Sequence, residues 1–117
     1  MKFKLIVVMA EDNLTDKAIE IARGHGATGC TVITSARGEG LNPTHTFLGL
    51  TVADQRDMIL FLVEEHLSRK ILEAVSSACG FEANPGTGVA FQIDIEDAIG
   101  LRGQIENIQQ EISKEDL

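Results

Sequence analysis

Two short glycine-rich segments have the composition of anion-binding loops. Arg37-Gly-Glu-Gly40 and Pro85-Gly-Thr-Gly88 each hold two glycines separated by one residue. Glycine lets the backbone approach a ligand closely, and successive amides can form a nest for phosphate oxygens. Both segments also fit ordinary turns, and neither matches a P-loop or a dinucleotide fingerprint. Arg37 and Arg102 also lie beside glycines, and a guanidinium there suits either phosphate or surface water.

The sequence contains no pattern typical of a catalytic site. His25, His45 and His66 are far apart in the chain, and Cys30 and Cys79 lack the spacing of metal ligands. We therefore predict that the protein is not an enzyme and requires no cofactor. The two cysteines are expected to be small buried side chains in a reducing compartment.

Length and charge limit the class of protein further. A chain of 117 residues is expected to form a single domain over 1–117, with a core at 1–103 and a tail at 104–117. The formal net charge of -8 argues against binding of nucleic acid or direct binding of lipid, because both require an excess of basic residues. The apolar run near the start is too short to span a bilayer, so we predict a cytoplasmic protein.

The strands and helices that position these segments are predicted from hydrophobic periodicity and from glycines that end helices. Apolar, β-rich runs predict four strands, at 2–9, 31–34, 57–63 and 89–95. Helical spacing predicts one helix that starts at a cap on Asp12 or Asn13 and ends at Gly24, and a second over 64–80. A long loop covers 37–56, and the apolar spacing within 102–117 predicts a short C-terminal tail helix.

This order of elements predicts an α+β, ferredoxin-like βαββαβ fold with an antiparallel four-stranded sheet. Two helices can cover only one face of such a sheet. The other face would then expose apolar residues, so we expect the chain to associate with itself.

The motifs taken together resemble the PII signal-transduction superfamily, in its divergent PII-like branch. The resemblance covers residues 1 to about 103 and rests on "GATGCTV" at 26–32, "RGEG" at 37–40 and "NPGTGVAFQIDIEDAIGLR" at 84–102. It implies a homotrimer that binds adenine nucleotides between subunits. It also implies that the long loop, called the T-loop in that family, engages a regulated transporter or metabolic enzyme.

The resemblance also implies roles for individual residues. In this chain the phosphates would be bound by Gly86, Thr87 and Gly88, and Gly38 and Gly40 would form the base of the T-loop. A neighbouring subunit would contribute Gly29, Thr31 and Arg102. We add Arg37, at the edge of the loop, to these predicted nucleotide-binding residues. The T-loop lacks lysine and has an apolar character suited to a protein groove. Its predicted partner-binding residues are Leu41, Phe47, Leu48 and Leu50.

Several positions depart from the family pattern. The chain contains no tyrosine, and no serine lies between Arg37 and Arg56, which excludes the two known modifications of the T-loop. Val89 replaces a lysine after the glycine turn, and Gly100 replaces an arginine. Each lost cation removes a charge-assisted phosphate contact worth about 1.5–3 kcal/mol. We therefore expect weaker ATP binding than in classical members, with AMP, ADP or another small anion as the effector, and no response to 2-oxoglutarate.

An alternative function shares the same architecture. Trimeric metal-binding proteins of the copper-tolerance type have a similar fold, and His45, Cys30 and Cys79 would be the ligands here. This alternative predicts that the purified protein retains copper or zinc.

Overall fold

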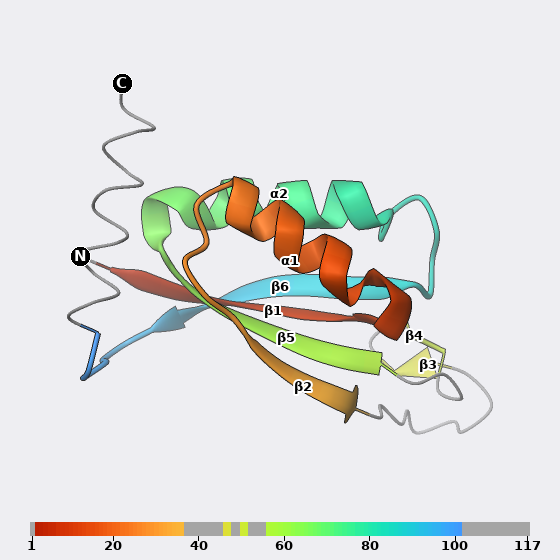
Figure 1. Cartoon of the computed structure of the whole chain (residues 1–117), viewed down its shortest axis with the longest axis horizontal. Helices are drawn as coiled ribbons and strands as arrows, with labels where there is room; N and C mark the ends of the chain where they lie inside the picture. The colour runs from red at the N-terminus through yellow and green to blue at the C-terminus, as the bar shows by residue number, and fades with distance from the viewer. Residues whose placement is uncertain (1, 37–45, 48–49, 52–55, 102–117) are drawn as a thin grey trace.

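The computed structural model of the chain describes residues 2–36, 46–47, 50–51 and 56–101. Four strands form an antiparallel sheet with the order β2-β5-β1-β6, and two helices lie on one of its faces (Figure 1). The elements of this layer pair are β1 (Phe3–Glu11), α1 (Thr15–Gly24), β2 (Thr31–Ala36), β5 (Arg56–Glu64), α2 (Glu65–Cys79) and β6 (Gly88–Ile95). The predicted ferredoxin-like fold is confirmed. Within the described ranges, no helix has the length and apolar character needed to cross a membrane.

The main core lies between the helices and the sheet. The inward faces of α1 and α2 carry the residues expected from helical spacing, including Ala18, Ala22, Ile71 and Val75, none of which is exposed to solvent. They pack against alternate residues of the two central strands, such as Phe61 of β5. The 3.6-residue periodicity of the helices therefore identified the buried side chains correctly.

Glycines end both helices as predicted. Gly26 has a φ of 107°, and Gly80 takes the left-handed conformation with a φ of 71° at the end of α2. The predicted cap at the start of the first helix is wrong. Asp12 and Asn13 lie inside a short 3-10 helix, η1 (Asp12–Leu14), and no side-chain cap is formed there.

The long loop contains more structure than the sequence predicted. Two strands of two residues each, β3 (Thr46–Phe47) and β4 (Leu50–Thr51), pair antiparallel within it. Elements this short produce no measurable periodicity, so sequence patterns cannot reveal them. The predicted tail helix at 102–117 lies outside the described residues.

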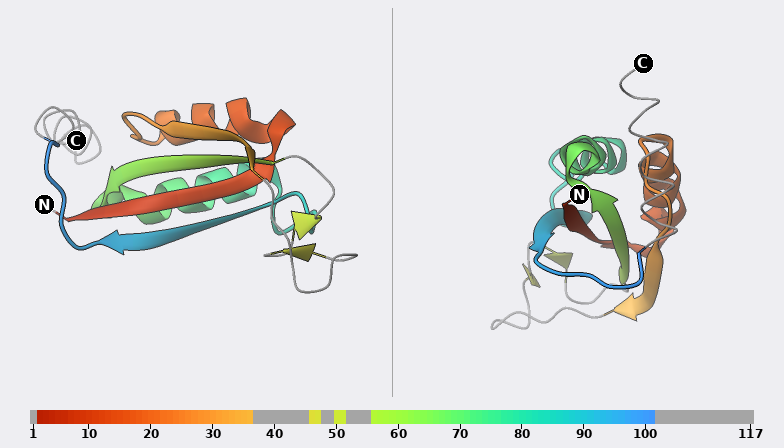
Figure 2. Two further views of the ribbon diagram at one scale, coloured as in Figure 1. Left: turned by 90° about the horizontal axis from the view of Figure 1, so that it is seen from below. Right: turned by 90° about the vertical axis from the view of Figure 1, so that its left-hand side faces the viewer.

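The sheet face opposite the helices is apolar, as expected. Val7 and Met9 form its buried centre on β1. Towards the sheet edges, Ile33 is 46% exposed, Phe91 37% and Ile93 48%. No described helix covers this face, and Figure 2 shows both helices on the other side. An apolar sheet surface of this kind usually contacts another protein chain.

Candidate functional site

The glycine turn before β6 is a well-defined β-turn. Thr87 donates its backbone N–H to the Asn84 carbonyl at 3.3 Å, and its hydroxyl donates to the same oxygen at 2.8 Å. Pro85 occupies the second position of the turn, and Gly86, at the third position, has a φ of 90°. Proline followed by a glycine with positive φ is the residue pair required by a type II turn. The local sequence therefore accounts for the backbone path at the predicted phosphate site.

Two amides of this turn are available to an incoming ligand. The Thr87 N–H is used within the turn, but Gly86 donates no backbone hydrogen bond in the described part of the chain. The Thr87 carbonyl accepts from the Glu11 amide of β1 at 3.2 Å. Because alternate residues of an edge strand face away from its neighbour, the Gly88 N–H is directed to the outer edge of β6. Gly86 and Gly88 can therefore donate to an anion.

A buried arginine holds the inner side of the same turn. Arg56, only 1% exposed, donates from Nη2 to the Gly86 carbonyl at 2.9 Å and from Nη1 to the Thr87 carbonyl at 3.1 Å. Its Nη1 also lies 3.6 Å from the Glu11 carboxylate. Charge-assisted hydrogen bonds of this kind are stronger than those between neutral groups. We did not predict a role for Arg56, because its partners lie 30 and 31 residues further along the chain.

The same arginine lies where the long loop leaves and rejoins the sheet. Ala36, the last residue of β2, pairs with Arg56, the first residue of β5. Arg56 is also paired with Glu11 on the other side. The two ends of the long loop are therefore adjacent in the sheet, and the glycine turn lies at the same end of the sheet.

Comparison with known proteins identifies the family. Residues 3–104 match the family model of the nitrogen regulatory protein P-II. The chain belongs to the P-II family. No curated protein matches the chain.

Solved structures support the assignment. The apo form of CPII, a nitrogen regulatory PII-like protein from Thiomonas intermedia K12, is 25% identical, with a TM-score of 0.63 over 81% of this chain and 90% of that one. CPII bound to ADP, AMP and acetate is 24% identical, with a TM-score of 0.60 over 82% of this chain and 90% of that one. CPII bound to ADP and bicarbonate is 23% identical, with a TM-score of 0.58 over 83% of this chain and 91% of that one.

The P-II fold does not bring all the predicted nucleotide residues together within one chain. Thr31 begins β2, at the sheet edge opposite the one formed by β6. Three strand spacings separate these two edges, a distance of roughly 14 Å. Gly29 and Thr31 therefore cannot reach the glycine turn of their own subunit, and a role at a neighbouring subunit's turn stays a prediction.

Most predicted residues of the T-loop and tail cannot be placed. The residues that lie outside the described part of the chain are Arg37, Gly38, Gly40, Leu41, Leu48 and Arg102. For Phe47 and Leu50 the structure gives the backbone pairing of β3 with β4 alone. The predicted roles of these residues in nucleotide or partner binding stay predictions.

Gly88 has a packing role that we did not predict. A Cβ built on this residue would lie 2.3 Å from Cε1 of Phe81 and 2.7 Å from Cζ. Phe81 is only 8% exposed and belongs to the main core. The aromatic ring therefore requires glycine at position 88, whether or not a ligand binds there.

The structure gives no support to the alternative metal site. Cys79 is buried in the core, and burial raises the pKa of its thiol, which disfavours the thiolate needed to bind a metal. His45 lies outside the described residues. Among the described residues the one group of three metal-ligand types is Glu64, Glu65 and His66. There, the Glu64 carboxylate accepts from the His66 backbone N–H at 2.6 Å and lies 2.6 Å from its Nδ1, an arrangement that caps α2.

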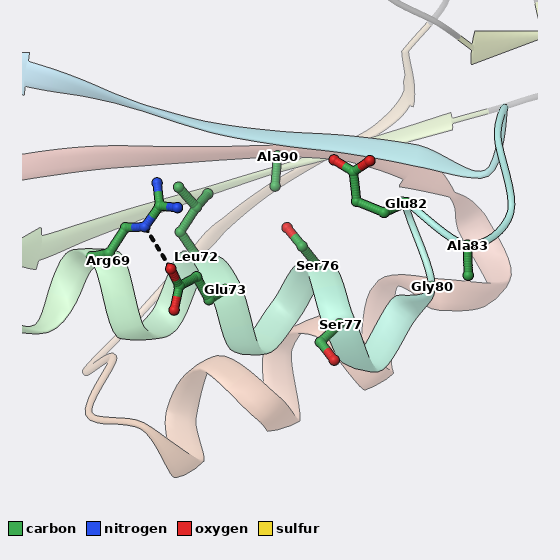
Figure 3. Close-up of a pocket in the computed structure, with 9 residues that line it drawn as sticks. All are labelled: Arg69, Leu72, Glu73, Ser76, Ser77, Gly80, Glu82, Ala83 and Ala90. Carbon is green, nitrogen blue, oxygen red and sulfur yellow. Dashed lines mark hydrogen bonds and ion pairs between the residues drawn. The ribbon is translucent and has the colours of Figure 1, made fainter.

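A separate hollow of about 510 Å³ lies between α2, the connection that follows it, and β6. Figure 3 shows the Arg69–Glu73 ion pair at one end and Glu82 near the other. The residues that line it are Arg69, Leu72, Glu73, Ser76, Ser77, Gly80, Glu82, Ala83 and Ala90. Of the predicted nucleotide residues that the structure describes, none lines the hollow, so it is distinct from the glycine turn.

Proposed function

We propose that this P-II family protein is a non-catalytic regulator that binds an adenine nucleotide at the glycine turn and controls a partner protein through its T-loop. The observation that carries the proposal is the pair of available amides at Gly86 and Gly88. They lie at the same end of the sheet as the adjacent T-loop ends, Ala36 and Arg56. A ligand at the turn would therefore bind close to the points from which the T-loop extends.

An adenine nucleotide is the first ligand to test. Backbone amides are good donors to phosphate oxygens, and CPII from Thiomonas intermedia K12 is described with ADP and AMP. The absence of the family's lysine at Val89 favours a ligand with fewer charges than ATP. Bicarbonate is a useful additional ligand, since CPII is described with ADP and bicarbonate together.

Isothermal titration with AMP, ADP and ATP, with and without magnesium, tests the proposed site. Thr87→Glu places a negative charge on the turn and should weaken ADP binding by about tenfold or more through charge repulsion. Thr87→Gln is the matched neutral variant, and it should bind ADP several-fold more tightly than Thr87→Glu because it adds no negative charge. The absence of binding by the wild-type protein, or equal affinities of the two variants, would contradict the proposed site.

The assembly we propose is a homotrimer formed through the apolar sheet face. Predicted contacts from Gly29, Thr31 and Arg102 of a neighbouring subunit would then complete the nucleotide site. Ile93, 48% exposed on that face, is the residue to change. Ile93→Lys should shift the mass in solution from trimer to monomer because it buries an unpaired charge, whereas Glu73→Lys on exposed α2 should leave the trimer intact. A wild-type monomer, or a trimer in the Ile93→Lys variant, would argue against this assembly.

The T-loop is the proposed contact with the regulated transporter or enzyme. Scrambling residues 41–52 should abolish partner capture and leave both the oligomeric state and ADP binding unchanged. The residues at issue are Leu41, Phe47, Leu48 and Leu50. Undiminished capture by the scrambled protein would show that the partner binds elsewhere.

A further inference from the structure

Arg56 is a buried charged side chain. Neither the sequence motifs nor the proposed ligand contacts explain its presence. It lies on the sheet face opposite the helices, in register with Glu11 on β1. From there its guanidinium extends past β1 to the carbonyls of Gly86 and Thr87, beyond the start of β6. One side chain thus joins three segments that are far apart in the sequence.

The two accepting carbonyls determine how the turn is oriented. A peptide plane is rigid, so fixing its carbonyl also fixes the N–H on the opposite side of the plane. The Thr87 carbonyl, which Arg56 holds at 3.1 Å, belongs to the same peptide as the Gly88 amide. The bond to the Gly86 carbonyl at 2.9 Å holds the preceding peptide in the same way. Arg56 therefore constrains the direction in which the outer amide of Gly88 faces.

The backbone of Arg56 connects this turn to the long loop. Arg56 is the first residue of β5, and it pairs with Ala36, the residue that precedes the loop. A displacement of the turn carbonyls would pull on the guanidinium and hence on the start of β5. The Glu11 carboxylate, 3.6 Å from Nη1 and 35% exposed, is an additional contact that balances the buried charge.

We propose that Arg56 is the positioning residue of the glycine turn. It fixes the turn carbonyls from within, presents the outer amide to the ligand, and couples the turn to the two ends of the long loop. The statement about the ligand rests on the proposed function, whereas the statement about the turn does not. Lysine could not replace this residue fully, because the planar guanidinium contacts two carbonyls in a fixed geometry.

Hydrogen exchange without any nucleotide tests the positioning role directly. Arg56→Gln should speed exchange of the Thr87 and Glu11 amides by about tenfold, since their local structure loses charge-assisted hydrogen bonds. Arg56→Lys should give an intermediate rate. Arg69→Gln, which removes an arginine from an exposed ion pair with Glu73, is the matched control and should leave both amides unchanged. Unchanged exchange in a folded Arg56→Gln protein would overturn the inference.

ADP titration of the same variants separates this inference from the proposed function. ADP affinity should fall by about tenfold in Arg56→Gln and recover in part in Arg56→Lys. Glu11→Gln keeps the arginine and removes a nearby negative charge, so it should tighten ADP binding about two- to threefold, mostly at low salt. If Glu11 and Arg56 had a structural role alone, Glu11→Gln would not increase the affinity for ADP.

Each remaining outcome has a defined meaning. Faster exchange in Arg56→Gln with no ADP binding by wild type would support the positioning role and refute the proposed nucleotide function. ADP binding by wild type that is unchanged in all Arg56 variants would overturn the claim that Arg56 presents the outer amide to the ligand and would leave the proposed function standing. If Arg56→Gln does not fold, Arg56→Lys decides the inference, and wild-type exchange rates in that variant would overturn it.

Discussion

Replacement of Gly88 by alanine tests whether packing, rather than ligand binding, requires glycine at this position. The new Cβ would lie 2.3, 2.7 and 2.8 Å from three carbon atoms of the Phe81 ring. Ordinary contacts between carbon atoms are about 3.5–4.0 Å, so the ring would have to move by more than about 1 Å. Phe81 is 8% exposed and packs in the main core, which leaves little room for that movement.

The magnitude follows from two opposing effects. Overpacking of a core costs about 1–3 kcal/mol. Alanine in a strand is more favourable than glycine by about 0.5–1 kcal/mol, because glycine loses more backbone entropy on folding. The midpoints of the two ranges give an expected net loss for Gly88→Ala of about 1 kcal/mol in the free energy of unfolding. The measurement is urea unfolding followed by circular dichroism at one protein concentration, because the stability of a protein that self-associates depends on its concentration.

A double-mutant cycle identifies the cause of the loss. Phe81→Leu alone should cost about 1–2 kcal/mol, less than the 3–5 kcal/mol typical of Phe→Ala. If the steric clash causes the loss, Gly88→Ala should cost at least about 1 kcal/mol less in the Phe81→Leu background. Gly24→Ala is the control, because a Cβ at Gly24 meets no atom within 4 Å. A fully stable Gly88→Ala protein, or two changes that simply add, would refute the packing explanation.

Three other predictions concern the core, a helix end and a buried thiol. Ile71→Ala should lower the free energy of unfolding by about 2–5 kcal/mol because Ile71 is fully buried. Glu73→Ala, on the exposed side of α2, should change it by less than about 0.5 kcal/mol. Equal urea midpoints for the two variants would contradict the assigned core. Gly80→Ala should cost about 1–2 kcal/mol in the same assay because φ at Gly80 is 71°, and a neutral result would show that the helix ends differently. Cys79 should react with iodoacetamide about tenfold more slowly than Cys30, because burial raises the pKa of the Cys79 thiol. Mass spectrometry of the two cysteine-containing peptides measures both rates, and comparable rates would contradict this prediction.

Local patterns in the sequence were sufficient for most of the fold. Helical spacing identified the buried faces of α1 and α2, and the glycines after each helix were correctly predicted to end it. The Pro85–Gly86 pair specified a turn whose conformation depends on adjacent residues alone. Such features were predictable because the interacting groups lie within a few residues of one another. The sequence therefore located the glycine turn correctly, and the role of that turn as a ligand site stays a prediction.

Only the tertiary structure decided what surrounds that turn. The strand order placed β2 and β6 at opposite edges, so Gly29 and Thr31 lie away from the turn of their own chain. Folding also brought Arg56 to carbonyls 30 and 31 residues away, and Phe81 against Gly88. These contacts depend on sheet register and on the packing of α2 over the sheet, which no short stretch of sequence encodes. The sequence by itself determined where the turn is, and the fold determined which residues hold it in place.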